Sequence, residues 1–102
     1  MTETDIQSAI RLKLSEFGIV IRQQSGNFEL KDGRRLLCGI KGLSDLLFIG
    51  QGYVAFIEVK TATGKPSKEQ LHFIEVIKRM GHRAGIARSV EDALKIILQE
   101  DI

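Results

Sequence analysis

The run from Tyr53 to Lys60 constrains the fold of this chain more than any other segment. Up to Ile57 it is almost entirely apolar, so neither face of a strand here would be polar. A strand that is apolar on both faces is typical of the centre of a sheet covered by other elements. The run therefore predicts a central strand, with the charged residues Glu58 and Lys60 at its end.

A second strand and a helix are predicted on the two sides of this run. Asp45 to Ile49 is apolar after its first residue, and Gly50-Gln51-Gly52 predicts a hairpin that joins it to the central strand. Ser67 followed by Gln70 gives the capping-box pattern, which predicts a helix that runs to about Met80.

The rest of the chain supplies the other elements of an α/β fold. Apolar residues recur at helical spacing before Gly18 and predict a first helix, namely Ile6, Ala9, Ile10, Leu14 and Phe17. Short apolar runs predict strands at 19–21, 28–30, 35–37 and 83–87, and Lys31-Asp32-Gly33 predicts a turn between the second and the third of them. Ser89 is expected to cap a last helix. Gln23 to Phe28 is interpreted as mainly loop. This order predicts a mixed sheet flanked by helices.

Length and composition indicate one globular domain over residues 1–102. A chain of 102 residues has room for a single core, and 43% hydrophobic with 27% charged residues is typical of a globular protein. The net charge of +2 permits a nucleic-acid partner without requiring one. Cys38 is the only cysteine, which excludes an internal disulfide and a cysteine-rich zinc site. We find no secretory signal and no apolar run near the ~18 residues that cross a bilayer, so we expect a cytoplasmic protein without a membrane partner.

The charged residues at the end of the central strand are the candidates for chemistry. Glu58 and Lys60 are two apart, so their side chains leave the same face of the strand. If the predicted hairpin forms, Asp45 lies near Glu58, and the two carboxylates would suit a hard divalent ion such as Mg²⁺. A simple ion pair on a solvated strand face, with Asp45 as a turn residue, would also explain these residues.

Four short motifs follow one another along the chain: Glu3-Thr4-Asp5-Ile6-Gln7, Gly42-Leu43-Ser44-Asp45-Leu46-Leu47, Phe56-Ile57-Glu58-Val59-Lys60 and Gly64-Lys65-Pro66-Ser67-Lys68-Glu69-Gln70. In this order they resemble the motifs of the virus-type replication-repair nuclease (VRR-NUC) family of the PD-(D/E)xK nuclease superfamily. The resemblance spans nearly the whole chain and implies a restriction-endonuclease-like fold with an αβββαβ core. One departure is Ser44, which stands where the superfamily name implies proline, a position that supplies no ligand.

The resemblance implies a role for each motif residue of the central site. Asp45 and Glu58 would be metal ligands, together with the backbone carbonyl of Val59. Lys60 would be the catalytic lysine. The implied cofactor is Mg²⁺ or Mn²⁺.

Two outer residues receive roles from the resemblance as well. Glu3 would reach the metal through water or complete the acidic cluster, and Gln70 would lie near the catalytic lysine. Each also has a structural explanation. Acids are favoured in the first turn of a helix by its dipole, and the capping box accounts for a glutamine at position 70.

The implied reaction is hydrolysis of a DNA phosphodiester by an activated water, in line with the leaving 3′ oxygen, to give a 5′-phosphate. The metal would draw charge from the phosphoryl oxygens while Lys60 holds the water or a nonbridging oxygen. Compact family members resemble Holliday-junction resolvases and act as homodimers. We therefore expect branched DNA (a four-way junction or flap) as the partner, a homodimer, and a bacterial or phage-encoded protein of DNA repair.

Basic residues beside the expected site are candidates for phosphate contacts. Lys41, Lys65 and Lys68 lie in expected loops or at a helix start, so we expect them to bind DNA. The cluster from Lys78 to Arg83 is better explained as favourable cations at a helix end.

Two other functions remain open at this point. The first is a flap-cleaving or restriction-like nuclease that uses the same site. The second is a DNA-binding module with a degenerate site, against which the intact set Asp45, Glu58 and Lys60 speaks.

Overall fold

The computed structural model describes residues 1–23, 26–29, 31–33, 35–38 and 42–99, and it describes side chains for 1–23, 31–33 and 42–99. Three helices and six strands lie in these ranges. In chain order they are α1 (Glu3–Leu14), β1 (Ile19–Arg22), β2 (Gly26–Glu29), β3 (Arg35–Cys38), β4 (Leu46–Ile49), β5 (Val54–Val59), α2 (Lys68–Arg79), β6 (Arg83–Ala87) and α3 (Val90–Leu98). None of the described helices is long and apolar enough to cross a membrane.

Four strands form the central sheet in the order β1-β4-β5-β6. The β1–β4 and β4–β5 pairs are antiparallel, whereas β5 and β6 are parallel. A parallel pair needs a crossover connection, which α2 supplies here. The predicted hairpin from Asp45 to Lys60 and the predicted αβββαβ core with a mixed sheet are therefore confirmed.

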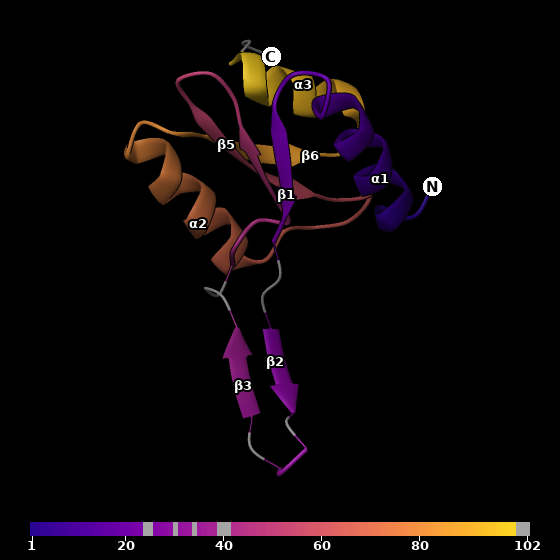
Figure 1. Ribbon diagram of the computed structural model, residues 1–102, viewed down its shortest axis with the longest axis vertical. Helices are drawn as coiled ribbons and strands as arrows, with labels where there is room; N and C mark the ends of the chain where they lie inside the picture. The colour runs from indigo at the N-terminus through magenta and orange to yellow at the C-terminus, as the bar shows by residue number, and fades with distance from the viewer. Residues whose placement is uncertain (24–25, 30, 34, 39–41, 100–102) are drawn as a thin grey trace.

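The helices cover the two faces of this sheet unequally (Figure 1). α1 and α3 contact each other and pack over one face, while α2 packs on β5 and β6 from the other. The buried core lies under α1 and α3, where Ile10 and Leu14 meet Phe48, Ile57 and other apolar side chains of the sheet. Residues of β5 alternate between the two faces, so Ile57 and Val59 enter this core and Glu58 faces the α2 side.

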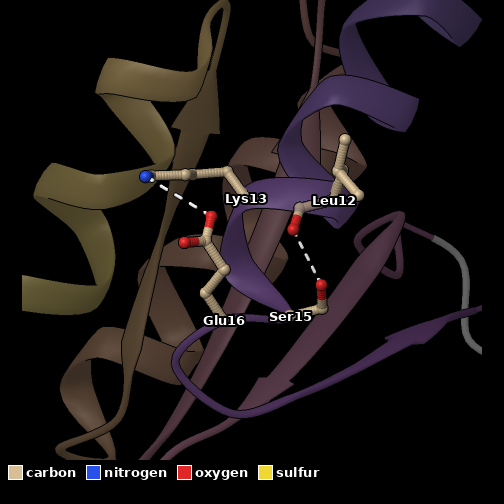
Figure 2. Close-up of polar contacts among 4 residues, drawn as sticks. All are labelled: Leu12, Lys13, Ser15 and Glu16. Atoms are coloured by element: carbon tan, nitrogen blue, oxygen red, sulfur yellow. Dashed lines mark hydrogen bonds and ion pairs between the residues drawn. The ribbon is translucent and has the colours of Figure 1, made fainter.

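The first helix is shorter than its apolar pattern predicts. It begins with a capping box between Thr2 and Asp5 and ends at Leu14. Beyond it the backbone tightens, with the Phe17 N–H donating to the Leu14 carbonyl at 2.9 Å, and Phe17 is 56% exposed. Figure 2 shows this end of the helix, where the Ser15 hydroxyl donates to the Leu12 carbonyl at 2.7 Å and Lys13 pairs with Glu16 at 3.4 Å.

A separate two-stranded hairpin lies between β1 and β4 in the sequence. β2 and β3 pair antiparallel, with Phe28 opposite Leu36 and Glu29 opposite Arg35. In Figure 1 this hairpin extends away from the central sheet along the long axis of the molecule. The prediction of a hairpin about positions 31–33 is confirmed, but the interpretation of residues 26–28 as loop is wrong, because they belong to β2. Glycine and asparagine there are poor strand formers that cross-strand pairing overrides.

Candidate active site

The β4–β5 register brings the two predicted carboxylates together. Leu46 pairs with Ile57, so Asp45 lies opposite Glu58 at the end of the hairpin. The Asp45 Oδ2 atom accepts a hydrogen bond from the backbone N–H of Val59 at 2.8 Å. This bond fixes the carboxylate against β5, beside the Glu58 side chain.

Among the residues whose side chains the structure describes, Glu58 is the only charged one that is buried, with 2% of its surface exposed. The pKa of Glu58 is raised to about 9, mainly by burial and also by the hydrogen bond with Asp45 and the negative charge of Asp45. The Lys60 ammonium partly opposes this shift. At neutral pH and without a cation, Glu58 therefore holds a proton between the two carboxyl groups.

The donor set at this position fits a hard divalent cation. The Glu58 Oε1 atom is buried and has no hydrogen-bond partner among the described residues, which is costly unless a ligand completes it. Asp45 and Glu58 offer oxygen atoms alone, the ligands that Mg²⁺ and Mn²⁺ prefer. Within the described ranges no group of three or more His, Cys, Asp or Glu side chains gathers. Two carboxylates with water and a carbonyl are a sufficient set for Mg²⁺.

Lys60 lies directly beyond this pair on the same face of β5. Its backbone N–H donates to the Ala87 carbonyl at 3.1 Å, which extends the parallel β5–β6 pairing past the end of the strand. The side chain is half-buried, and its charge acts on the Glu58 carboxyl. An ammonium group is thus held within electrostatic reach of the carboxylate pair.

Glu3 lies at the start of α1, where it is exposed. Its negative charge also raises the pKa of Glu58, which places it within electrostatic reach of the same site. The helix-dipole explanation of this acid holds too, because Glu3 is in the first turn.

Gln70 makes the contacts of a capping residue. Its Oε1 atom accepts from the Ser67 N–H at 2.8 Å, and its own N–H donates to the Ser67 hydroxyl at 3.1 Å. The structural explanation of this glutamine is confirmed, and its role near Lys60 stays a prediction.

The predicted DNA-binding lysines divide into two groups. Lys65 and Lys68 are exposed, in the loop before α2 and in the first turn of that helix. Lys41 lies outside the described residues.

Arg88 is a residue of this region that the sequence alone did not indicate. Its Nη1 atom donates to the carbonyls of Thr61 at 2.5 Å and Gly64 at 2.7 Å, so it holds the turn that follows Lys60. Its backbone N–H donates to the Asp92 carboxylate at 2.9 Å. Arg88 is separated in the sequence from Thr61 by 27 positions and from Gly64 by 24, so no local sequence pattern predicts these contacts.

Gln23 is a second residue that the sequence analysis missed. Its backbone N–H donates to the Asp45 carbonyl at 2.8 Å, and its Nε2 atom donates to the Ser44 carbonyl at 3.2 Å. Gln23, Asp45 and Glu58 therefore form one row across β1, β4 and β5. The pattern gave no signal, because Gln23 stands in a polar stretch.

Comparison with solved structures identifies this architecture. One structure described as a VRR_NUC domain has a TM-score of 0.69 and 24% sequence identity, with 99% of this chain and 100% of that chain covered. The chain has the VRR_NUC fold. A structure described as a VRR_NUC domain protein has a TM-score of 0.68 and 18% identity, and the match covers 97% of this chain and 87% of that one. No protein-family model matches the sequence, and no curated protein does.

The VRR_NUC fold agrees with the family resemblance of the four sequence motifs. The motif segments that contain Asp45 and Lys60 lie at the β4–β5 hairpin, where these two residues meet at one end of the sheet. The motif that ends in Gln70 opens α2, and the first motif opens α1.

Proposed function

We propose that this chain is a metal-dependent DNA endonuclease that hydrolyses phosphodiester bonds at the site of Asp45, Glu58 and Lys60. The observation that carries the proposal is the buried carboxylate pair. Among the described residues one oxygen of Glu58, beside Asp45, has no hydrogen-bond partner, and a lysine follows on the same strand face. The VRR_NUC description of the two similar structures supports the same assignment.

Asp45, Glu58 and the carbonyl of Val59 would hold the cation, Mg²⁺ or Mn²⁺. When bound, such a cation stabilises negative charge on the phosphoryl oxygens and lowers the pKa of a water molecule. Asp45 is held in place for this task by the Val59 N–H. Glu58 would release its proton on cation binding, so that both carboxylates could serve as ligands.

Lys60 would act on the scissile group itself. Its ammonium orients the attacking water or stabilises charge on a nonbridging oxygen, in line with departure of the 3′ oxygen. Arg88 supports this step indirectly, because it fixes the turn from Thr61 to Gly64 directly after the lysine. Glu3 would add negative charge at the rim and reach the cation through water.

The proposed substrate is branched DNA in the manner of a Holliday-junction resolvase, and the proposed assembly is a homodimer. Lys65 and Lys68 are exposed next to the turn that follows the catalytic lysine, so they would contact phosphates on either side of the cut. The motif resemblance supports the junction, a phage or bacterial origin and action in the host cytoplasm.

A cleavage panel tests this proposal. Four-way junction, flap and linear duplex DNA are incubated with Mg²⁺, Mn²⁺ or EDTA, using wild type, Asp45→Ala and Lys60→Ala. We expect metal-dependent cleavage that favours the junction and is lost in both variants. Cleavage that persists in EDTA, or in both variants, would contradict the mechanism. Binding without cleavage would support a degenerate DNA-binding module, and preference for a flap or for linear duplex would replace the resolvase assignment.

A further inference from the structure

β1 is an open edge of the central sheet. It pairs with β4, and no other described strand lies on its second side. The Gln23 N–H donates to the Asp45 carbonyl, so the backbone groups of Gln23, and of every second residue before it, point towards β4. Because backbone groups alternate between the two sides of an antiparallel strand, the N–H and C=O of Val20 and Arg22 point to the open side. Four strong hydrogen-bonding groups are therefore available there.

The side chains around this edge are apolar and exposed. Ile19 is 61% exposed, Ile21 is 42% exposed, and Phe17 just before the strand is 56% exposed. Ile19 and Ile21 face the α2 side of the sheet, since Val20 between them packs against the core under α1 and α3. On that side α2 packs on β5 and β6.

Edge strands of soluble proteins are normally protected by charge, proline, a bulge or a covering element. β1 has one charged residue, Arg22, at its end, and its sequence Ile-Val-Ile-Arg has high strand propensity. An edge of this kind is suited to pairing with another strand.

We infer that β1 pairs antiparallel with β1 of a second copy of the chain, across a two-fold axis at Ile21. Two identical strands are complementary to each other in antiparallel orientation. When Ile21 lies opposite Ile21 of the second copy, Val20 pairs with Arg22 of the second copy, and Arg22 pairs with Val20 of the second copy. All four outward backbone groups are then satisfied, and the two arginines lie at opposite ends. These features favour a second copy over an unrelated partner.

This pairing would combine two four-stranded sheets into one continuous sheet and would place both candidate sites on the same face. Strands lie about 4.8 Å apart and rise about 3.4 Å per residue, which puts the two Asp45 residues about 20 Å from each other. If the proposed nuclease function holds, two cuts can then be made on one DNA without the dimer dissociating. The pairing itself rests on the sheet edge and stands or falls independently of catalysis.

Cysteine cross-linking tests the axis directly. At a non-hydrogen-bonded antiparallel pair the two Cα atoms are about 4.5 Å apart, within the range of a disulfide. We expect Ile21→Cys in a Cys38→Ser background to form a covalent dimer with a mild oxidant. Ile19→Cys is the matched control, because the proposed register separates the two copies of residue 19 by about 14 Å. Equal cross-linking of both variants, or none at position 21, would overturn the proposed register.

Light scattering tests the assembly without any readout of activity. We expect wild type at about 100 µM to have a mass near twice the 11.4 kDa of one chain. Ile21→Lys should reduce the mass to that of one chain, because two ammonium groups would face each other at the axis. Leu98→Lys changes an exposed apolar residue of α3 in the same way and should leave the mass unchanged. A monomeric wild type, or an Ile21→Lys protein that remains dimeric, would overturn the inference. An inactive but dimeric wild type would instead count against the proposed nuclease.

Discussion

The carboxylate of Asp45 accepts a hydrogen bond from the backbone N–H of Val59, across the β4–β5 hairpin and directly beside the buried Glu58. The contact links two residues that lie 14 positions apart in the sequence. The register of β4 and β5 therefore fixes the position of the Asp45 carboxylate, and it places this negative charge beside the buried carboxyl group of Glu58. The chemistry we propose follows from this arrangement.

Stability in EDTA should depend on pH through Glu58. Its pKa is raised from 4.5 to about 9, so between these values the folded state holds a proton that the unfolded chain releases. The free energy of unfolding should therefore fall as pH rises from about 5 towards 9. Thermal unfolding at pH 5.5, 7 and 8.5 measures this slope. Glu58→Gln should flatten it and raise Tm at pH 8.5, by about 4–8 °C per kcal/mol recovered. The same slope in wild type and variant would show that another group is responsible.

Arg88→Ala should lower both stability and cleavage. The variant loses two hydrogen bonds from a guanidinium to the half-buried turn after Lys60, worth about 1.5–3 kcal/mol each at most. We expect a kcat about ten-fold lower, with KM for DNA little changed, because the turn places the lysine. Arg79→Ala is the control, since the Arg79–Glu75 pair at 2.9 Å is exposed and contributes little. Equal effects of the two substitutions would exclude a positioning role for Arg88.

Two substitutions distinguish a capping role of Gln70 from a role in catalysis. Gln70→Ala removes one half of the capping box and should destabilise the chain by about 1 kcal/mol. Gln70→Glu keeps a side-chain acceptor for the Ser67 N–H, so a capping role predicts wild-type stability and cleavage. Chemical denaturation and a cleavage assay on the same samples separate the two roles. Loss of cleavage in a Gln70→Glu protein of normal stability would support the role that the family resemblance implies.

Gly42 should resist substitution more strongly than a glycine in open space. Its φ is +85°, and a Cβ there would lie 2.3 Å from the Glu69 carbonyl oxygen at the start of α2. Gly52 has a φ of +82° with no atom within 4 Å of an added Cβ. Gly52→Ala should therefore lower the free energy of unfolding by about 1–2 kcal/mol, because alanine is strained in the left-handed conformation. Gly42→Ala should lower it clearly more, because a steric clash is added. Equal midpoints in urea would show that the contact at Glu69 relaxes freely.

Local sequence patterns were sufficient for the elements that carry the site. The glycine-rich link at residues 50–52, the apolar strand up to Ile57 and the capping box at Ser67 each report local structure, and each forms as predicted. The juxtaposition of Asp45 and Glu58 followed from the hairpin register.

Tertiary contacts account for what the sequence did not reveal. Gln23 lies beside Asp45 only because β1 pairs with β4. Arg88 reaches the turn at Thr61 only because β6 lies beside β5. The spacing of Phe17 predicts that it belongs to the first helix, but α1 ends at Leu14 and leaves Phe17 exposed. Spacing alone cannot show where a helix ends without a strong stop signal.

Calorimetric titration of Mn²⁺ into the protein tests the central claim, that Asp45 and Glu58 hold a divalent cation. We expect one Mn²⁺ per chain in wild type and at least a ten-fold loss of affinity in Glu58→Gln and in Asp45→Asn. Glu75→Gln, which alters an exposed glutamate of α2, should bind like wild type. Unchanged Mn²⁺ affinity in Glu58→Gln, or no binding by wild type, would contradict the claim.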